Sequence, residues 1–211
     1  MRPYTPVTHC NKRGSFDIMV KIYGTGPPAQ FPNKGSMSQF LNTLRPGAKV
    51  QIQGPKGRFV YEGRGRFALI DDGHLPLVTR LGLVAAGTGV TPMLQLLRHI
   101  LSDDIDQTRV YMIDVNTSDK DIIARLELDE YAKGFDHQFS ICHVLSQPPS
   151  SEDAVQNYEA GPLSREIMEQ YLPTPDYGVL VLCCGPPSLI NDVIKPALMQ
   201  IGYKPHQVLC Y

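Results

Sequence analysis

Apolar residues in the second half of the chain gather in short runs, and stretches of mixed polarity separate one run from the next. Short apolar runs bounded by glycine and proline are typical of buried strands, whereas longer amphipathic stretches favour helices. Strands are predicted near residues 81–86, 109–115, 139–145, 179–184 and 207–210. Helices are predicted near residues 91–102, 124–133, 164–171 and 186–201. This α/β alternation predicts a five-stranded parallel sheet, Rossmann-like, with ligands at the carboxyl ends of its strands.

The first 70 residues have a different pattern, with partial alternation of apolar and polar positions and many β-branched side chains. Strands are predicted over residues 2–7, 15–24 and 48–54. A short helix is expected over residues 36–44, with Ser36 or Ser38 as its cap, and residues 71–79 read as a linker. The chain is therefore expected to form two domains. Their predicted boundaries are 1–76 and 77–211.

Two predicted strands are followed by glycine and then by proline at the start of a helix. Residues 87–89 read Gly-Thr-Gly, and Gly185 and Pro186 follow Cys184. Backbone N–H groups at a helix N-terminus, with the helix dipole behind them, bind phosphate. Either loop alone is equally consistent with a tight turn, because the first lacks the third glycine of the dinucleotide fingerprint. The fingerprint also includes an acidic residue at the end of the next strand, and the only candidate here, Asp114, lies inside a predicted strand. Together, the two loops predict a dinucleotide site.

The N-terminal segment carries a third candidate motif, an arginine, an aromatic residue and a hydroxyl along an extended stretch. In a strand Arg2, Tyr4 and Pro6 share one face, while Thr5 points the other way. A guanidinium suits a pyrophosphate, and a phenol packs on a ring or a ribose.

These motifs, taken in order, resemble those of the NADH-cytochrome b5 reductases. The matching stretches are RPYTPV (2–7), VKIY (20–23), GSMSQFL (35–41), GPKGRFVYEGRGRF (54–67), AGTGVTPM (86–93) and CGPP (184–187). The resemblance covers essentially the whole chain. It implies an antiparallel β-barrel domain that binds FAD, followed by an α/β domain that binds NADH. The implied reaction passes a hydride from NADH to FAD, and then single electrons to cytochrome b5 or a similar acidic heme protein.

The resemblance implies that residues of the first part bind FAD. Arg2 would bind the pyrophosphate, Tyr4 and Thr5 would lie beside the flavin ring and ribityl chain, and a short helix start would cradle the phosphates. The residues with implied flavin contacts are Arg2, Pro3, Tyr4, Thr5, Val20, Tyr23, Gly35, Met37, Ser38 and Thr91.

The resemblance implies that Cys184 and Lys21 serve the nicotinamide nucleotide. Cys184 would lie next to nicotinamide C4 and orient the ring, without acting as a nucleophile; the other interpretation is a small buried apolar residue. Lys21 would lie near the nucleotide, and Tyr211 near the flavin. The nucleotide loops would comprise Gly87, Thr88, Gly89, Gly185 and Pro186.

One departure from the family concerns the start of the chain. The Arg-x-Tyr-Thr motif lies midway through the barrel in relatives, but here it begins at residue 2. We expect the first barrel strands and any membrane anchor to be missing, and we expect the chain as given to bind flavin weakly or not at all. The chain as given is expected to be a soluble monomer. In a full-length form, such an anchor would hold it at the cytoplasmic side of the endoplasmic reticulum or the mitochondrial outer membrane.

Charged residues are distributed unevenly along the chain. Residues 1–70 contain 11 lysines and arginines but only two acids, Asp17 and Glu62, although the net charge of the whole chain is −1. Such a basic half would steer an acidic electron acceptor toward it. Nucleic acid is not the expected partner, because no stacking platform or recognition helix accompanies the charge. The five cysteines have no C-x-x-C spacing, and the six scattered histidines suggest no metal site.

Nicotinamide preference and the wider context stay open at this stage. Where many NADH-preferring relatives carry an aspartate, this chain has Ser146, so NADH is expected and NADPH is possible. Alternative interpretations are the reductase module of a larger nitrate reductase-like or oxygenase system, and an inactive nucleotide-binding fragment with an incomplete flavin site.

Overall fold

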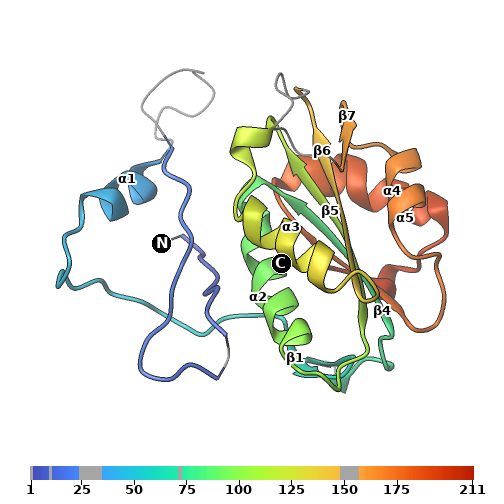
Figure 1. The fold of residues 1–211 in the computed structure, drawn as a ribbon, viewed down its shortest axis with the longest axis horizontal. Helices are drawn as coiled ribbons and strands as arrows, with labels where there is room; N and C mark the ends of the chain where they lie inside the picture. The colour runs from blue at the N-terminus through green and yellow to red at the C-terminus, as the bar shows by residue number, and fades with distance from the viewer. Residues whose placement is uncertain (1, 10, 24–34, 71–72, 148–156) are drawn as a thin grey trace.

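The computed structural model describes residues 2–9, 11–23, 35–70, 73–147 and 157–211. Figure 1 shows a twisted sheet with helices on both faces, and beside it a loosely wound N-terminal part. The N-terminal part contacts the sheet layer through apolar and polar side chains, and Val7 is buried in the same core as residues of the helix that follows residue 89. Lys21 pairs with Asp121, and the Arg98 guanidinium donates to the carbonyl oxygen of Val7.

The parallel sheet has six strands in the order β7-β6-β5-β4-β8-β9, and the five predicted strands are confirmed. Their bounds are β4 Arg80–Ala86, β5 Arg109–Asn116, β6 Phe139–Leu145, β8 Val179–Cys184 and β9 Val208–Cys210. The sixth strand, β7 (Tyr158–Ala160), was not predicted. It is short and pairs only with the end of β6, so its sequence carries no buried apolar run.

Helices cover both faces of this sheet and bury two separate cores (Figure 1). On one face lie α2 (Val90–Leu101) and α3 (Arg125–Gly134), over residues such as Leu83 and Met112. The other face is covered by α4 (Arg165–Tyr171) and α5 (Lys195–Ile201), the latter preceded by a π-helical segment, Leu189–Ile194. The predicted helices are confirmed to within a few residues. Short 3-10 turns span Gly87–Gly89, Asp119–Asp121 and Pro205–Gln207.

A small antiparallel sheet joins the N-terminal part to the parallel sheet. It comprises β1 (Phe59–Gly63), β2 (Arg66–Leu69) and β3 (Gly73–His74). Tyr61 and Phe67 pack against α2, and Tyr61 donates to the carboxylate of Asp106. Part of the expected linker, residues 73–74, is therefore a strand, while residues 71–72 lie outside the described residues. The linker prediction failed there because a two-residue strand has no periodicity to detect.

The three strands expected before residue 58 are absent among the described residues. Residues 2–7 and 15–23 meet only in one isolated bridge, between Pro6 and Ile18; residue 24 lies outside the described residues. Ile22, Val50 and Ile52 are exposed instead of covering a core. Alternation identifies extended chain, but a strand also needs a hydrogen-bonding partner, which these segments do not find.

The expected short helix is present as α1 (Ser36–Thr43), with a different cap. Gly35 occupies the N-cap position at φ 80°, and neither Ser36 nor Ser38 caps the helix with its side chain. The Ser38 hydroxyl instead donates to the carbonyl oxygen of Gly35, at 3.0 Å, and accepts from the N–H of Tyr23, at 3.2 Å. The helix start is thereby tied to residues 20–23.

Candidate functional site

A large cavity lies at the carboxyl edge of the parallel sheet, between the sheet and the N-terminal part. Its volume is about 1280 Å³, larger than the ~300–1,000 Å³ typical of one small-molecule pocket. Every predicted site residue except Val20 lines it: Arg2, Pro3, Tyr4, Thr5, Lys21, Tyr23, Gly35, Met37, Ser38, Gly87, Thr88, Gly89, Thr91, Cys184, Gly185 and Pro186. Val20 lines a separate cavity of about 370 Å³ beside residues 120–124.

The two glycine loops of the sheet pack against each other at this edge. A Cβ atom added to Gly89 would lie 2.1 Å from the carbonyl oxygen of Cys184, and one added to Gly185 would lie 2.8 Å from the Ala86 Cβ. Glycine is therefore required at both positions for the loops to approach. The Thr91 hydroxyl donates back to the carbonyl oxygen of Thr88, at 3.1 Å.

The start of α2 suits a bound phosphate. No side chain caps the turn Gly87–Gly89 or the N-terminus of α2, and no acidic residue lies in the first turn. The first backbone N–H groups of a helix have no partner within the helix, and the helix dipole attracts an anion to them. The loop residues therefore fit the diphosphate of a dinucleotide.

A second helix N-terminus faces the same cavity from the N-terminal part. The start of α1 has no side-chain cap, and a Cβ atom on Gly35 would lie 2.7 Å from the carbonyl oxygen of Tyr23. Within the described residues, Arg2 has no carboxylate at ion-pair distance. An unpaired guanidinium near open helix amides fits the diphosphate of a second nucleotide.

Cys184 ends β8, is half-buried and lines the cavity. Burial raises the pKa of its thiol to about 11, so the side chain is neutral at physiological pH. A neutral thiol packs as a small, polarisable group and does not act as a thiolate nucleophile. Tyr211 lines the same cavity and meets Phe59 edge-on, with ring centroids 4.9 Å apart.

Lys21 links the two sides of the cavity. Its ammonium nitrogen lies 2.8 Å from Asp121 Oδ1, in the turn that follows β5. The hydrogen bond from Lys21 is the main cause of the lowered pKa of Asp121. Because both side chains are about one-third exposed, the pair can exchange partners when a charged ligand arrives.

Asp114 does not line the cavity, contrary to what a dinucleotide fingerprint would require. It is buried inside β5, where His143 Nδ1 lies 3.1 Å from its Oδ2 and the Asn116 amide donates to the same oxygen at 2.8 Å. Burial raises the pKa of Asp114, and the contacts with His143 and Asn116 oppose that shift. This carboxylate therefore holds two strands together and is not a ligand contact.

Several cavity residues were not predicted as site residues. Asn116 ends β5, Thr117 follows it, and Leu163 follows β7. The rule that ligands gather at the carboxyl ends of parallel strands identifies Asn116 and Thr117. The same rule could not identify Leu163, because the strand before it, β7, was not predicted.

Comparison with known proteins adds independent observations. A family model described as an oxidoreductase FAD-binding domain matches residues 1–61, and one described as an oxidoreductase NAD-binding domain matches residues 83–195. Human NADH-cytochrome b5 reductase 2 is 36% identical over all of this chain and 76% of its own length. The chain belongs to the NADH-cytochrome b5 reductase family. NADH-cytochrome b5 reductase 1 of Bos taurus is 37% identical and is covered over 69% of its length.

Solved structures agree with this membership. The cytochrome b5 reductase domain of Ulva prolifera nitrate reductase is 30% identical, with a TM-score of 0.91 over all of this chain and 76% of that one. The Amycolatopsis cytochrome P450 reductase GcoB, 19% identical with a TM-score of 0.71, shares the fold. The expected ferredoxin reductase-like fold is thus confirmed, and the chain is an oxidoreductase with FAD-binding and NAD-binding regions. In the part of the chain that the structure describes, no helix is long and apolar enough to cross a bilayer.

Proposed function

We propose that this protein transfers a hydride from NADH to FAD and passes the electrons singly to a heme protein such as cytochrome b5. One observation carries the proposal. One cavity, between the sheet and the N-terminal part, is lined by residues at two uncapped helix N-termini, those of α1 and α2, and by Cys184. Two diphosphate-binding ends around one cavity are what a two-nucleotide reaction needs.

Strand order supports a direction for NADH along the sheet edge. From Cys184 on β8, the edge passes the loop after β4, then Asn116 on β5, then Ser146 after β6. The nicotinamide end would lie at Cys184, the diphosphate on the amides of Gly87 and Thr88, and the adenosine end toward Ser146. The neutral Cys184 thiol would then orient the ring without competing chemistry.

The flavin side is assigned to the N-terminal part. Arg2 and the amides that start α1 would hold the FAD diphosphate, while Tyr4 and Thr5 would lie along the ring system. Tyr211, packed on Phe59, would shield the reacting face from water. Bound FAD would supply the change from two-electron to one-electron transfer, which no side chain performs.

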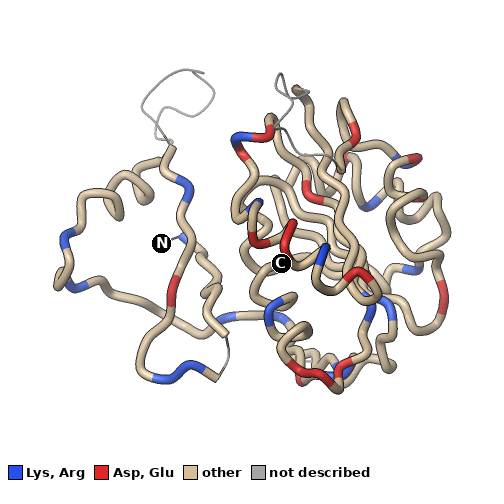
Figure 2. The backbone as a smooth tube through the Cα atoms, viewed as in Figure 1, with Lys and Arg blue, Asp and Glu red and all other residues tan. Residues whose placement is uncertain are grey.

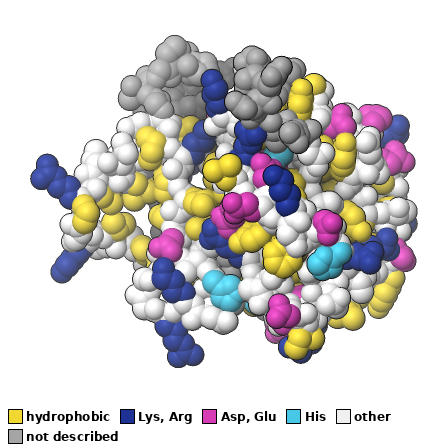
Figure 3. Space-filling view, in the orientation of Figure 1, with side chains coloured by type: hydrophobic (Ala, Val, Ile, Leu, Met, Phe, Trp, Pro, Cys, Tyr) yellow, Lys and Arg dark blue, Asp and Glu magenta, His cyan; other side chains and the backbone are white. Residues whose placement is uncertain are grey.

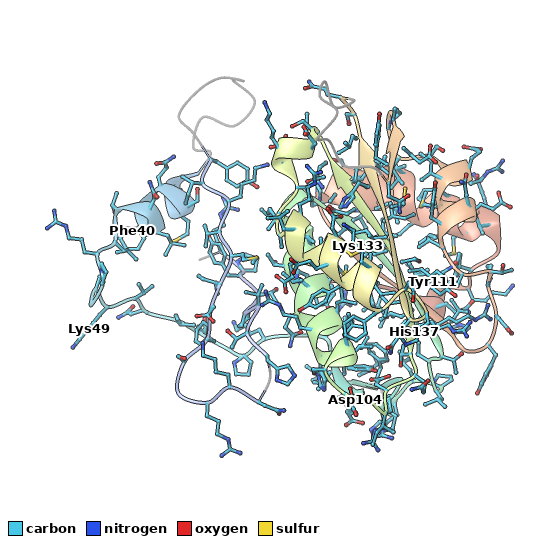
Figure 4. All side chains as sticks on the ribbon, viewed as in Figure 1. Phe40, Lys49, Asp104, Tyr111, Lys133 and His137 are labelled. Atoms are coloured by element: carbon cyan, nitrogen blue, oxygen red, sulfur yellow. The ribbon has the colours of Figure 1, made fainter. Side chains whose placement is uncertain are left out.

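The basic half of the molecule supports an acidic acceptor such as cytochrome b5. Figure 2 shows lysines and arginines distributed along the N-terminal part, and Figure 3 shows several projecting from it at the left of the view. Arg64 is paired with Asp103 at 3.3 Å, whereas Lys49 forms no ion pair within the described residues and points outward (Figure 4). A monomeric state and attachment at the cytoplasmic face of a membrane remain expectations from the resemblance.

Nitrate reduction is the second candidate context, because the similarity to the Ulva prolifera nitrate reductase domain extends over the whole chain. The two contexts differ in the acceptor, which would be a separate heme protein or a heme domain of the same polypeptide. A heme-domain sequence in the same gene would favour the nitrate reductase context.

The proposed function is tested with the chain in saturating FAD. We expect NADH-dependent reduction of cytochrome b5 that saturates with NADH and exceeds the rate with FAD alone. Ferricyanide serves as a parallel acceptor that does not need a protein docking surface. Reduction of neither acceptor above the FAD control would contradict the proposal, and reduction of ferricyanide alone would restrict it to the hydride step.

A further inference from the structure

Two cysteines lie directly opposite each other in the last two strands of the parallel sheet. Cys183 of β8 is in register with Cys210 of β9. Both side chains pack into the core beneath α4 and α5, whereas the neighbouring Cys184 packs into the core on the opposite face. Cys183 is fully buried and Cys210 is half-buried. The fold thus separates one pair of thiols from the cavity cysteine.

The spacing of the pair suits a disulfide that is strained. Neighbouring strands lie about 4.8 Å apart, within the ~4.4–6.8 Å between Cα atoms that a disulfide spans. Parallel side chains do not converge, so closing the bond draws the strands together. Because β9 has three residues and is an edge strand, it can yield to that movement. A strained disulfide is easily reduced, which favours a reversible bond over a permanent one.

The environment of the pair activates one thiol. The Cys183 thiol lies within hydrogen-bonding reach of the Cys210 sulfur, and this contact, followed by the charges of Lys195 and Arg58, lowers the pKa of Cys210 to about 6. The same contact raises the pKa of Cys183. Cys210 is half-buried whereas Cys183 is fully buried, so a peroxide reaches Cys210 first. The lowered pKa of the Cys210 thiol agrees with its assignment as the nucleophile of the pair.

We propose that Cys183 and Cys210 are a redox modification site, at which a hydroperoxide forms a reversible disulfide between the strands. The Cys210 thiolate attacks the peroxide, the O–O bond breaks, and a sulfenic acid forms as hydroxide or alkoxide leaves. The Cys183 sulfur then attacks the sulfenic sulfur, the S–S bond forms, and water leaves. The two thiols give up two electrons, which reduce the peroxide to water, or to water and an alcohol.

The site is connected to the cavity at both ends. Tyr211 follows Cys210, and its N–H donates to the carbonyl oxygen of Cys183 at 3.1 Å. Cys184 follows Cys183, and both Tyr211 and Cys184 line the cavity. Disulfide formation therefore shifts two cavity residues, and it slows hydride transfer; this consequence rests on the proposed function.

Mass spectrometry of the full chain tests the modification without any assay of activity. After treatment with stoichiometric hydrogen peroxide, we expect the loss of two hydrogen atoms, a cross-linked peptide containing residues 183 and 210, and reversal by dithiothreitol. The variants C210V and C183A are expected to lose the cross-link, whereas C184A and C142A retain it. A wild-type chain that gains oxygen without cross-linking, or cross-links that survive in C210V, would overturn the assignment.

The connection to the cavity has its own readout. In saturating FAD, the oxidised wild-type chain is expected to reduce ferricyanide from NADH roughly threefold more slowly or worse, given the cost of small misplacements. Dithiothreitol should restore the rate, and C210V should not respond to peroxide. An unchanged rate in a fully cross-linked chain would refute the connection but not the disulfide. If the reduced chain has no activity, the proposed function fails while the mass result still decides the modification.

Discussion

The role proposed for Cys184, orienting the nicotinamide ring, depends on its position at the end of the strand before the second glycine loop. Its thiol is neutral and is not expected to react. For C184A we expect kcat for NADH oxidation to fall roughly tenfold, with KM nearly unchanged, because the cavity would orient the ring less well. Steady-state kinetics in saturating FAD measures both constants. The matched control is C142A, which removes a buried thiol away from the cavity. Equal kcat values for C184A and C142A would show that Cys184 is only a packing residue.

At Gly89 the first glycine loop packs directly against the backbone of the second. In G89A the new Cβ would meet the Cys184 carbonyl oxygen, which is backbone and cannot rotate away. We expect a loss of about 1–3 kcal/mol in the free energy of unfolding and at least roughly tenfold weaker NADH binding. Urea unfolding and NADH fluorescence titration measure these quantities.

The control for G89A is G134A, at the end of α3, where an added Cβ meets nothing within 4 Å. It should change stability by no more than about 1 kcal/mol. Wild-type affinity in G89A would contradict the proposed contact between the loops.

At the residue scale, local sequence patterns were enough to identify the two glycine loops of the cavity, whereas most of the other cavity residues followed from the resemblance to the family. Glycine and proline mark loop geometry locally, so Gly87, Gly89 and Gly185 were found without knowledge of the fold. Asp114 shows the limit of this approach, because its burial and its partner, His143, depend on the pairing of β5 with β6. Such pairing joins residues far apart in the sequence and leaves no local signal.

Strands β5 and β6 are joined by a buried polar contact. Asp114 and His143 are opposite each other and fully buried. H143F leaves Asp114 with only the Asn116 amide, and D114L removes the partner of the buried His143 Nδ1. We therefore expect each variant to lower the free energy of unfolding by about 1–3 kcal/mol. The double variant should cost clearly less than the sum of the two. Urea denaturation of the four proteins measures the coupling, and additive effects would show that the two side chains act independently.

At the element scale, the parallel sheet was predictable because each central strand is an apolar run between turn residues. The strand β7 and the three strands of the small sheet were not, because they are short and half-exposed. The expected strands of the N-terminal part failed for another reason. Their alternation is real, but Val50 and Ile52 lie exposed with no strand beside them in the described residues.

Positive charge is concentrated in the first 70 residues of the molecule, and we expect it to attract an acidic electron acceptor to that part. Lys49 projects from the N-terminal part, whereas Lys133 lies on α3 (Figure 4). At low ionic strength, K49E should lower kcat/KM for cytochrome b5 roughly threefold, and added salt should remove the difference. K133E is the matched control, since it makes the same charge change on the other part of the molecule. An equal effect of K49E and K133E would indicate a response to net charge and not to a docking surface.

Nicotinamide selectivity also depends on the arrangement of the whole sheet edge, because Ser146 reaches the cavity from the strand β6, far from Cys184. Serine provides no negative charge to repel a 2′-phosphate, so S146D should reduce the use of NADPH more than that of NADH. The ratio of kcat/KM values for the two cofactors measures this effect. An unchanged ratio would place the adenosine end elsewhere.

The central claim is that one cavity brings NADH and FAD together, and anaerobic stopped-flow spectroscopy tests it most directly. The chain in saturating FAD is mixed with NADH, and the decay of the flavin absorbance is followed. We predict a rate that saturates with NADH and exceeds that of free FAD. Decay at the rate of free FAD, under conditions in which fluorescence shows both nucleotides bound, would contradict the claim.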